Sequence, residues 1–198
     1  MINHVWGLFT RPNSEWPEMR GQEQRGHPRI YALFVLAAIP PVSAFIGTTR
    51  VGWAHGNAPA VRLTEASALP LAVFSYLAML AGVVVMGWFI HWMARTCHAT
   101  PTLRQCVMFA AYTATPLFLA GLAALYPNLW LAMLVGTAAV AYTAYLLYVG
   151  LPTFMGIHPD EGFLFASSVL AVGLVVLVAM LAASVVIWGM GIGPVYTL

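Results

Sequence analysis

The side chains best able to do chemistry in the apolar parts of this sequence are hydroxyls rather than charged groups. They gather in two neighbouring apolar segments and include Tyr112, Thr115, Tyr142 and Tyr145. A hydroxyl surrounded by hydrocarbon needs a hydrogen-bond partner. These side chains therefore predict either hydrogen bonds between helices, which is their commoner use, or the lining of a polar cavity.

Prolines inside apolar segments are the second group of candidates. Pro40 and Pro41 are adjacent, and each removes a backbone donor and crowds the carbonyl four residues earlier. We expect a sharp kink or a break between Leu36 and Ser43, with the freed carbonyls facing other helices or a water-filled pocket. Pro116 frees carbonyls in the same way. These prolines are the candidate hinge.

Metal and catalytic chemistry have little support in the sequence. His91, Cys97 and His98 lie close together, but no HxxxH or CxxC pair exists, and a histidine near a helix end is stable without a metal. The chain has no GxSxG or HExxH motif, and its apolar segments contain no carboxylate for acid–base catalysis. We therefore predict no catalytic, cofactor-binding or metal-binding residues and no enzymatic activity.

The elements that carry these residues are long apolar runs. Of the 198 residues, 61% are hydrophobic and 7% are charged. A soluble domain usually has about 25% charged residues. No charge falls inside the five runs, which cover residues 30–47, 69–93, 106–125, 129–150 and 163–190. The sequence predicts an all-α polytopic membrane protein with a compact bundle of five transmembrane helices, and it excludes a soluble enzyme and a nucleic-acid binder.

The third and fourth runs are separated by only residues 126–128, so they are expected to form an antiparallel hairpin. Residues at equal distances from that turn lie at equal depth, which pairs Tyr112 with Tyr142. Acidic residues Asp160 and Glu161 precede the fifth run, where the positive end of a helix dipole favours them.

The arginines predict the orientation in the membrane. Six of the eight basic residues lie on the side of the N-terminal segment and two on the other, counting across five spans. The positive-inside rule then places the N-terminus in the cytoplasm and the C-terminus outside. We expect residues 1–29 to be short helices on the inner membrane face with Trp6 and Trp16 as interface anchors, and residues 30–198 to form the five-helix domain.

Several segments resemble one known family. The run AYTATPL (Ala111–Leu117) and the run YTAYLLYVGLP (Tyr142–Pro152) resemble the third-span and fourth-span elements of the YIP domain family, the Ypt/Rab-interacting polytopic membrane proteins. The N-terminal HVWGLFTRP and the run Ala37–Thr49 resemble its bacterial inner-membrane branch. The resemblance covers nearly the whole chain.

The resemblance implies five spans, a bacterial inner membrane, a cytoplasmic N-terminus and an external C-terminus. Eukaryotic members of the family bind Rab GTPases through a long cytoplasmic N-terminal region. That region is reduced to 29 residues here, which makes GTPase binding doubtful. The family supplies no catalytic residues.

Two functions remain open at this point. The first is non-enzymatic membrane organisation or scaffolding, with the lipid bilayer, other membrane proteins or a second copy of the chain as partners. The second is a channel or carrier for an uncharged or weakly charged small solute. A continuous polar path lined by the hydroxyls would favour the channel, whereas a dry bundle with an apolar groove would favour scaffolding or lipid binding.

Overall fold

The structure is a computed structural model that describes residues 7–24, 31–52, 60–97, 99–126, 128–190 and 195–197. Its elements in chain order are α2 (Pro12–Gln24), α3 (Tyr31–Ile46), the π-helix η1 (Gly47–Val51), β1 (Arg62–Leu63), α4 (Glu65–Ala94), the 3₁₀ turn η2 (Arg95–Cys97), α5 (Leu103–Thr113), α6 (Thr115–Ala120), the 3₁₀-helix η3 (Gly121–Leu125), α7 (Leu129–Met155), α8 (Pro159–Gly189) and β2 (Tyr196–Thr197). Residues 7–10 form a further helical turn before α2.

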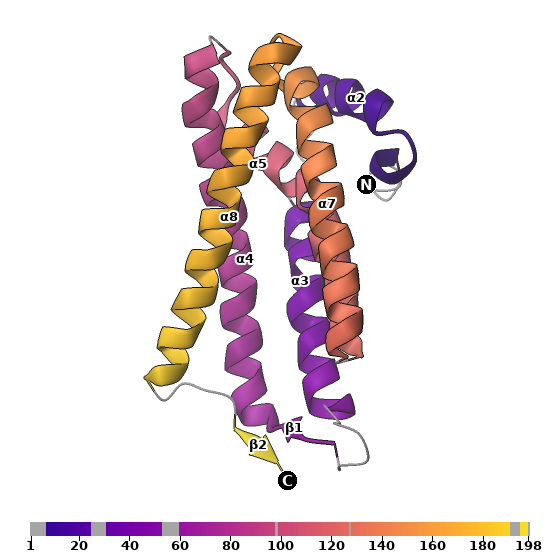
Figure 1. Cartoon of the computed structure of the whole chain (residues 1–198), viewed down its shortest axis with the longest axis vertical. Helices are drawn as coiled ribbons and strands as arrows, with labels where there is room; N and C mark the ends of the chain where they lie inside the picture. The colour runs from indigo at the N-terminus through magenta and orange to yellow at the C-terminus, as the bar shows by residue number, and fades with distance from the viewer. Residues whose placement is uncertain are drawn as a thin grey trace.

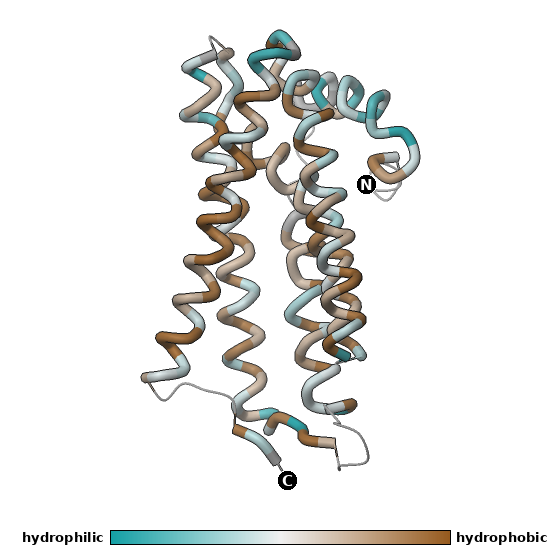
Figure 2. The backbone as a smooth tube through the Cα atoms, in the orientation of Figure 1, coloured by the Kyte–Doolittle hydropathy of each residue, from teal (hydrophilic) through white to brown (hydrophobic). Residues whose placement is uncertain are grey.

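The protein is an all-α polytopic membrane protein. Four helical stretches are long and apolar enough to cross a membrane: Phe34–Val51, Glu65–Ala94, Leu129–Met155 and Asp160–Gly189. Leu103–Thr113 and Thr115–Leu125 pass the same test only as a pair bent by 40°, which is the geometry of a broken span or of a re-entrant loop. Figure 2 shows the hydrophobic residues concentrated along the length of the bundle and the hydrophilic ones near its ends.

The helix boundaries follow local capping chemistry. Asn128 begins α7 by accepting hydrogen bonds from the amides of Trp130 and Leu131. The same helix ends at Gly156, whose φ of +70° is a left-handed conformation that favours glycine. Asp160 and Glu161 lie in the first turn of α8, which confirms the prediction for these two residues.

The two ends of the bundle are built differently (Figure 1). At one end, which we call the α2 end, α2 runs roughly crosswise to the spans and lies beside the end of α7. At the other, which we call the sheet end, β1 pairs antiparallel with β2. Between them run an odd number of spans if the bent pair counts as one, so α2 and β2 lie at opposite ends.

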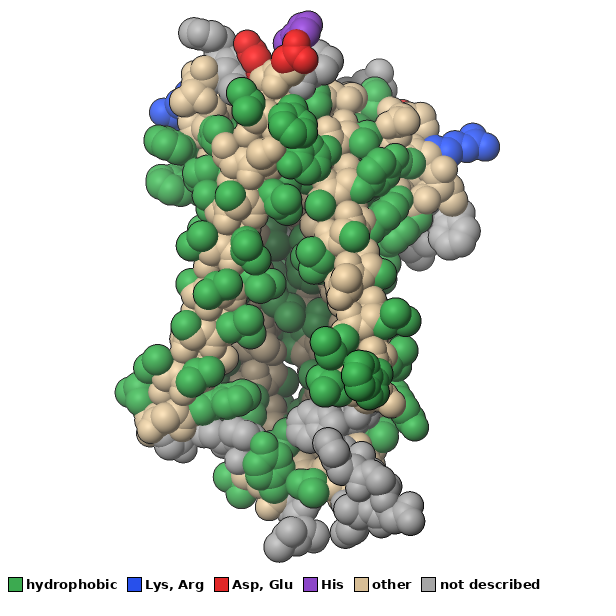
Figure 3. Space-filling model, in the orientation of Figure 1, with side chains coloured by type: hydrophobic (Ala, Val, Ile, Leu, Met, Phe, Trp, Pro, Cys, Tyr) green, Lys and Arg blue, Asp and Glu red, His purple; other side chains and the backbone are tan. Residues whose placement is uncertain are grey.

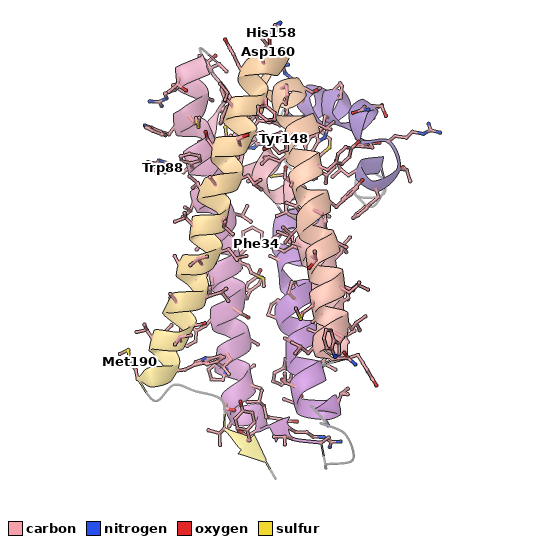
Figure 4. The ribbon with its side chains drawn as sticks, viewed as in Figure 1. Phe34, Trp88, Tyr148, His158, Asp160 and Met190 are labelled. Carbon is pink, nitrogen blue, oxygen red and sulfur yellow. The ribbon has the colours of Figure 1, made fainter. Side chains whose placement is uncertain are left out.

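The core lies toward the α2 end. The buried residues of α8 are confined to its first third and end at Val169, and those of α7 lie mostly between Leu146 and Met155. Toward the sheet end, α7 and α8 diverge, and Figure 3 shows a hollow between them. Figure 4 shows Phe34 of α3 in this gap. We call this hollow the groove.

Candidate functional site

The N-terminal segment is packed into the α2 end through Trp16. Its side chain is 0% exposed. The indole ring lies 5.0 Å from the ring of Phe109 in α5 and 6.2 Å from that of Phe154 in α7. It lies against Gly150, where any Cβ would collide with it. The expectation that Trp16 anchors the segment in the membrane interface is therefore wrong, because the indole is buried between α5 and α7 instead. Trp6 lies outside the described residues.

Tyr142 holds the turn before α2 against the bundle. Its hydroxyl donates a 2.9 Å hydrogen bond to the carbonyl of Leu8, and its ring stacks on Phe9 with centroids 5.2 Å apart. Tyr145 lies next to it, with ring centroids 5.7 Å apart. The Tyr142 phenol thus bonds to the backbone of a segment 134 residues away in the sequence, a partner that the hairpin argument did not identify.

The proline pair does not break the first span. Pro40 and Pro41 both lie inside α3, which is one continuous helix, so of the two expected outcomes, a kink or a break between Leu36 and Ser43, the break does not occur. Both prolines are buried, as expected for a face that meets other helices. Pro40 packs against Gly121 of η3, where a Cβ would come within 2.5 Å of the proline ring. The absence of a side chain on Gly121 makes room for that ring.

The broken span is the one that contains Pro116. α5 ends at Thr113 and α6 begins at Thr115, with Ala114 between them and Pro116 in the first turn of α6. A proline is well tolerated there because its missing amide has no partner within the helix. The Thr115 hydroxyl donates to the carbonyl of Ala111 across the bend, at 3.3 Å. Of the candidate prolines, Pro116 is therefore the one at a discontinuity.

The hydroxyls of the spans bond both within and between helices, and Thr115, Thr153 and Ser168 each donate to the carbonyl four residues earlier in their own segment. The Tyr148 hydroxyl and Ser167 share a 2.9 Å hydrogen bond that joins α7 to α8. Tyr112 is buried. Among the described residues, the Oγ1 atoms of Thr113 and Thr143 are buried without a hydrogen-bond partner. The candidate hydroxyls thus occupy separate places in the bundle rather than one shared cavity.

A cavity of about 390 Å³ opens at the α2 end. It is lined by Arg20 of α2, by Ala99, Thr100, Pro101 and Gln105 around the start of α5, and by Phe154 and Met155 of α7. Its wall is mostly polar. The sequence analysis missed this cavity because its residues come from three distant segments.

Two of the cavity residues are held by specific contacts. Arg20 donates from Nη1 to the carbonyl of Thr153 at 3.2 Å, near the carbonyl end of α7, and its guanidinium lies over Gly156. Gln105 forms a capping box with Thr102: its Oε1 accepts from the Thr102 amide at 2.8 Å, and its own amide donates to the Thr102 hydroxyl. The sequence pattern Thr-x-x-Gln at residues 102–105 is typical of a capping box and would have predicted this helix start.

His91 contacts Pro101, one of the residues that line the cavity. Its Nδ1 lies 3.0 Å from the carbonyl of Pro101, and its Nε2 lies 3.1 Å from Nη2 of Arg95. A carbonyl only accepts and a guanidinium only donates, so these contacts fit a neutral ring protonated on Nδ1. The imidazole therefore tethers the segment before α5 to α4. Cys97 ends the turn η2, and His98 lies outside the described residues; the described part of the chain contains no cluster suited to a metal.

The groove differs in character from the cavity. It lies between α7 and α8 toward the sheet end, and in this half of the two helices large apolar side chains are exposed to the surroundings, among them Leu134, Leu174 and Val178. No part of the most apolar stretch of α8 is buried inside the chain. Gly136 of α7 lies in open space, with nothing in the described part of the chain within 4 Å of where its Cβ would be.

Comparison with known proteins gives a family match over most of the chain. Residues 6–180 match the Yip1 domain. The sequence is 49% identical over 191 residues to the inner membrane protein YohC of Escherichia coli strain K12, covering 96% of this chain and 98% of that protein. The protein of the same name from Escherichia coli O6:H1 matches equally well. No solved structure gives a significant match.

Proposed function

This chain belongs to the Yip1 domain family, and on that premise we propose that it organises the membrane without catalysing a reaction, through contacts with lipid and with other membrane-embedded helices. Its relative YohC is an inner membrane protein, and we place this chain in the same kind of membrane. The arginine count puts the α2 end in the cytoplasm and the sheet end outside.

The observation that carries the proposal is the uncovered sheet-end half of α7 and α8. In a bilayer an apolar face of this kind is covered either by lipid or by another helix, because hydrocarbon provides no hydrophobic drive to hide it. Ala132 and Gly136 are four residues apart on α7, the spacing that lets two helices approach closely in lipid. The equivalent spacing in α4, Ala78 and Gly82, is already used, since Gly82 faces Met180 of α8. The α7 face is open to a partner helix, and we propose a second copy of this chain there.

The use of the hydroxyls supports the same proposal. Tyr142 bonds to the Leu8 carbonyl, Tyr148 to Ser167, and Thr115 to the Ala111 carbonyl. Hydroxyls bonded in this way stabilise the bundle and offer few groups to a passing solute. The cavity lies at one end of the molecule, and the groove is apolar.

A channel or carrier for an uncharged small solute is the second candidate. It is favoured by Thr113 and Thr143, whose buried hydroxyls lack partners within the described residues. Buried polar groups normally have partners, and water or a solute can supply them. This candidate requires a polar route through the bundle.

Reconstitution into liposomes separates the two functions. For scaffolding, energy transfer between differently labelled copies should report self-association, and Gly136→Leu should weaken it at least about tenfold because the larger side chain blocks close approach. Gly189→Leu is the control, since Gly189 also lies in open space but outside the small-residue pair. Glycerol uptake above that of protein-free liposomes, with no energy transfer, would favour the channel instead.

A further inference from the structure

We propose that the cavity at the α2 end binds a phosphate group, carried either by an anionic lipid headgroup or by free phosphate. The inference does not depend on the scaffolding role, because a channel of the same fold would keep the same cavity. It rests on the donors that face the cavity, the absence of competing negative charge there and the height of the cavity in the bundle.

Arg20 supplies the positive charge. Only one of the five guanidinium N–H groups is needed for its bond to the Thr153 carbonyl. The two terminal nitrogens of the guanidinium lie against Gly156, where a Cβ would come within 2.6 Å of each of them. Arg20 also lines the cavity, so its positive charge and its remaining N–H groups lie at the cavity wall. A guanidinium N–H group forms a strong, charge-assisted hydrogen bond with a phosphate oxygen.

Gln105 and Thr100 add neutral donors. The capping box uses Oε1 of Gln105 as an acceptor, which leaves the amide NH₂ of the same side chain as the donor group of this residue at the cavity. Thr100, whose side chain carries a hydroxyl, also lines the cavity. Gln105 also lies in the first turn of α5, where the partial positive charge of the helix favours an anion. Three residues with donor groups thus line one space.

Within the described part of the chain, no carboxylate lines the cavity. The carbonyl end of α7, which carries partial negative charge, borders the cavity, and the Arg20 guanidinium lies over it. One guanidinium with two neutral donors suits the single negative charge of a phosphodiester.

The position and size of the cavity fit a headgroup. The cavity lies where α7 ends and α5 begins, near the end of α4, which is the level at which spans leave the hydrocarbon. Lipid phosphates lie just beyond that level, in the headgroup region that borders a hydrocarbon core about 30 Å thick. The volume of about 390 Å³ lies within the range of about 300–1,000 Å³ that is typical of small-molecule sites.

The test is calorimetric titration of the purified full-length chain in detergent. The three probes are short-chain phosphatidylglycerol, short-chain phosphatidylcholine and inorganic phosphate. The sharpest variant is Gln105→Glu, because glutamate keeps the capping box with Thr102 while replacing the cavity amide with a negative charge. Arg20→Gln removes the guanidinium. Arg11→Gln is the matched control, since it removes one arginine from the same end of the molecule but outside the cavity lining.

We expect binding that weakens at least about tenfold in Gln105→Glu and in Arg20→Gln and changes less than about twofold in Arg11→Gln. Binding of phosphatidylglycerol but not phosphate identifies the source as lipid, and phosphate binding with the same variant pattern identifies it as free anion. The proposal is overturned if neither anion binds the unmodified chain, if Gln105→Glu binds them undiminished, or if phosphatidylcholine binds as tightly as phosphatidylglycerol. A thermal melt of each variant checks that Arg20→Gln still folds, and Gln105→Glu decides the matter if it does not.

Discussion

The two ends of the bundle solve the packing problem of a membrane protein in opposite ways. At the α2 end, side chains from α2, α5 and α7 pack around Trp16 and form most of the buried core. At the sheet end, α7 and α8 separate and leave large apolar side chains uncovered. The comparison teaches that one apolar helix can have different environments along its length. The α2-end halves of α7 and α8 pack against other parts of the protein, whereas their sheet-end halves must be covered by lipid or by another chain.

The largest expected difference between the two ends concerns tryptophan. Trp16→Ala should lower the free energy of unfolding by about 3–5 kcal/mol, because it empties a fully enclosed slot. Trp130 of α7 is 79% exposed, so Trp130→Ala should change stability by less than about 0.5 kcal/mol. Denaturant unfolding in detergent measures both. Equal losses would mean that the α2 end is no better packed than the sheet end.

Trp16→Phe refines that comparison. The indole N–H has no partner among the described residues. The substitution therefore loses packing contacts but also removes an unsatisfied donor. We expect a loss well below that of Trp16→Ala. A loss as large as that of alanine would show that the indole nitrogen has a partner, such as a buried water.

The next prediction contrasts two glycines in α7. Gly150→Ala places a Cβ against the Trp16 ring and should cost about 1–3 kcal/mol through overpacking. Gly136→Ala fills open space and should leave stability unchanged or raise it by up to about 1 kcal/mol, since alanine is the better helix former. Thermal melts monitored by tryptophan fluorescence separate the two. A destabilising Gly136→Ala would instead indicate an unrecognised contact at the sheet end.

A smaller effect is expected for the hydrogen bond between α7 and α8. Tyr148→Phe removes the bond to Ser167 and should cost about 1 kcal/mol or less, as is usual for such bonds within membranes. Tyr145→Phe is the control on the same helix, because the described contacts of Tyr145 are made by its ring. If both substitutions have the same effect, the hydrogen bond between Tyr148 and Ser167 does not contribute to holding α7 against α8.

The smallest effect is expected at the sheet end. Arg50 and Glu65 form an ion pair at 3.2 Å, and both side chains are mostly exposed. Arg50→Gln should cost between about 0 and 1 kcal/mol. The difference should disappear as NaCl is raised from about 0.05 M to about 0.5 M, because salt screens exposed charges. A loss that persists at high salt would mean that this end is more tightly packed than it is shown to be.

Much of the fold could be predicted from the sequence, because hydropathy and local capping act over short distances. The five apolar runs correspond to the spans, and the acidic start of α8 lies where the helix dipole requires it. The candidate residues were harder. Tyr142 is a hydrogen-bonding residue as expected, but its partner Leu8 could not be identified from spacing alone.

The errors have one physical origin, which is tertiary packing. Pro40 was expected at a kink or break in α3, yet α3 is continuous and the proline ring packs against Gly121 of a distant segment. Trp16 was expected at the interface, yet its indole packs against Gly150. In both places a glycine more than 80 residues away makes room for a ring, and no local pattern marks which glycine will meet which ring. Arg20 and Gln105 were missed in the cavity for the same reason.

The dependence of the N-terminal segment on α7 also imposes an order on biogenesis. The residue pair Leu8 and Tyr142 is separated by 134 positions. At a synthesis rate of about 5–20 residues per second, between roughly 7 and 27 s pass after Leu8 is made before Tyr142 exists. The Trp16 slot is likewise incomplete until Gly150 and Phe154 have been added. A segment that is made before all the spans is thus among the last to reach its final place, and in a chain truncated before α7 the Trp16 indole would lack the residues that enclose it.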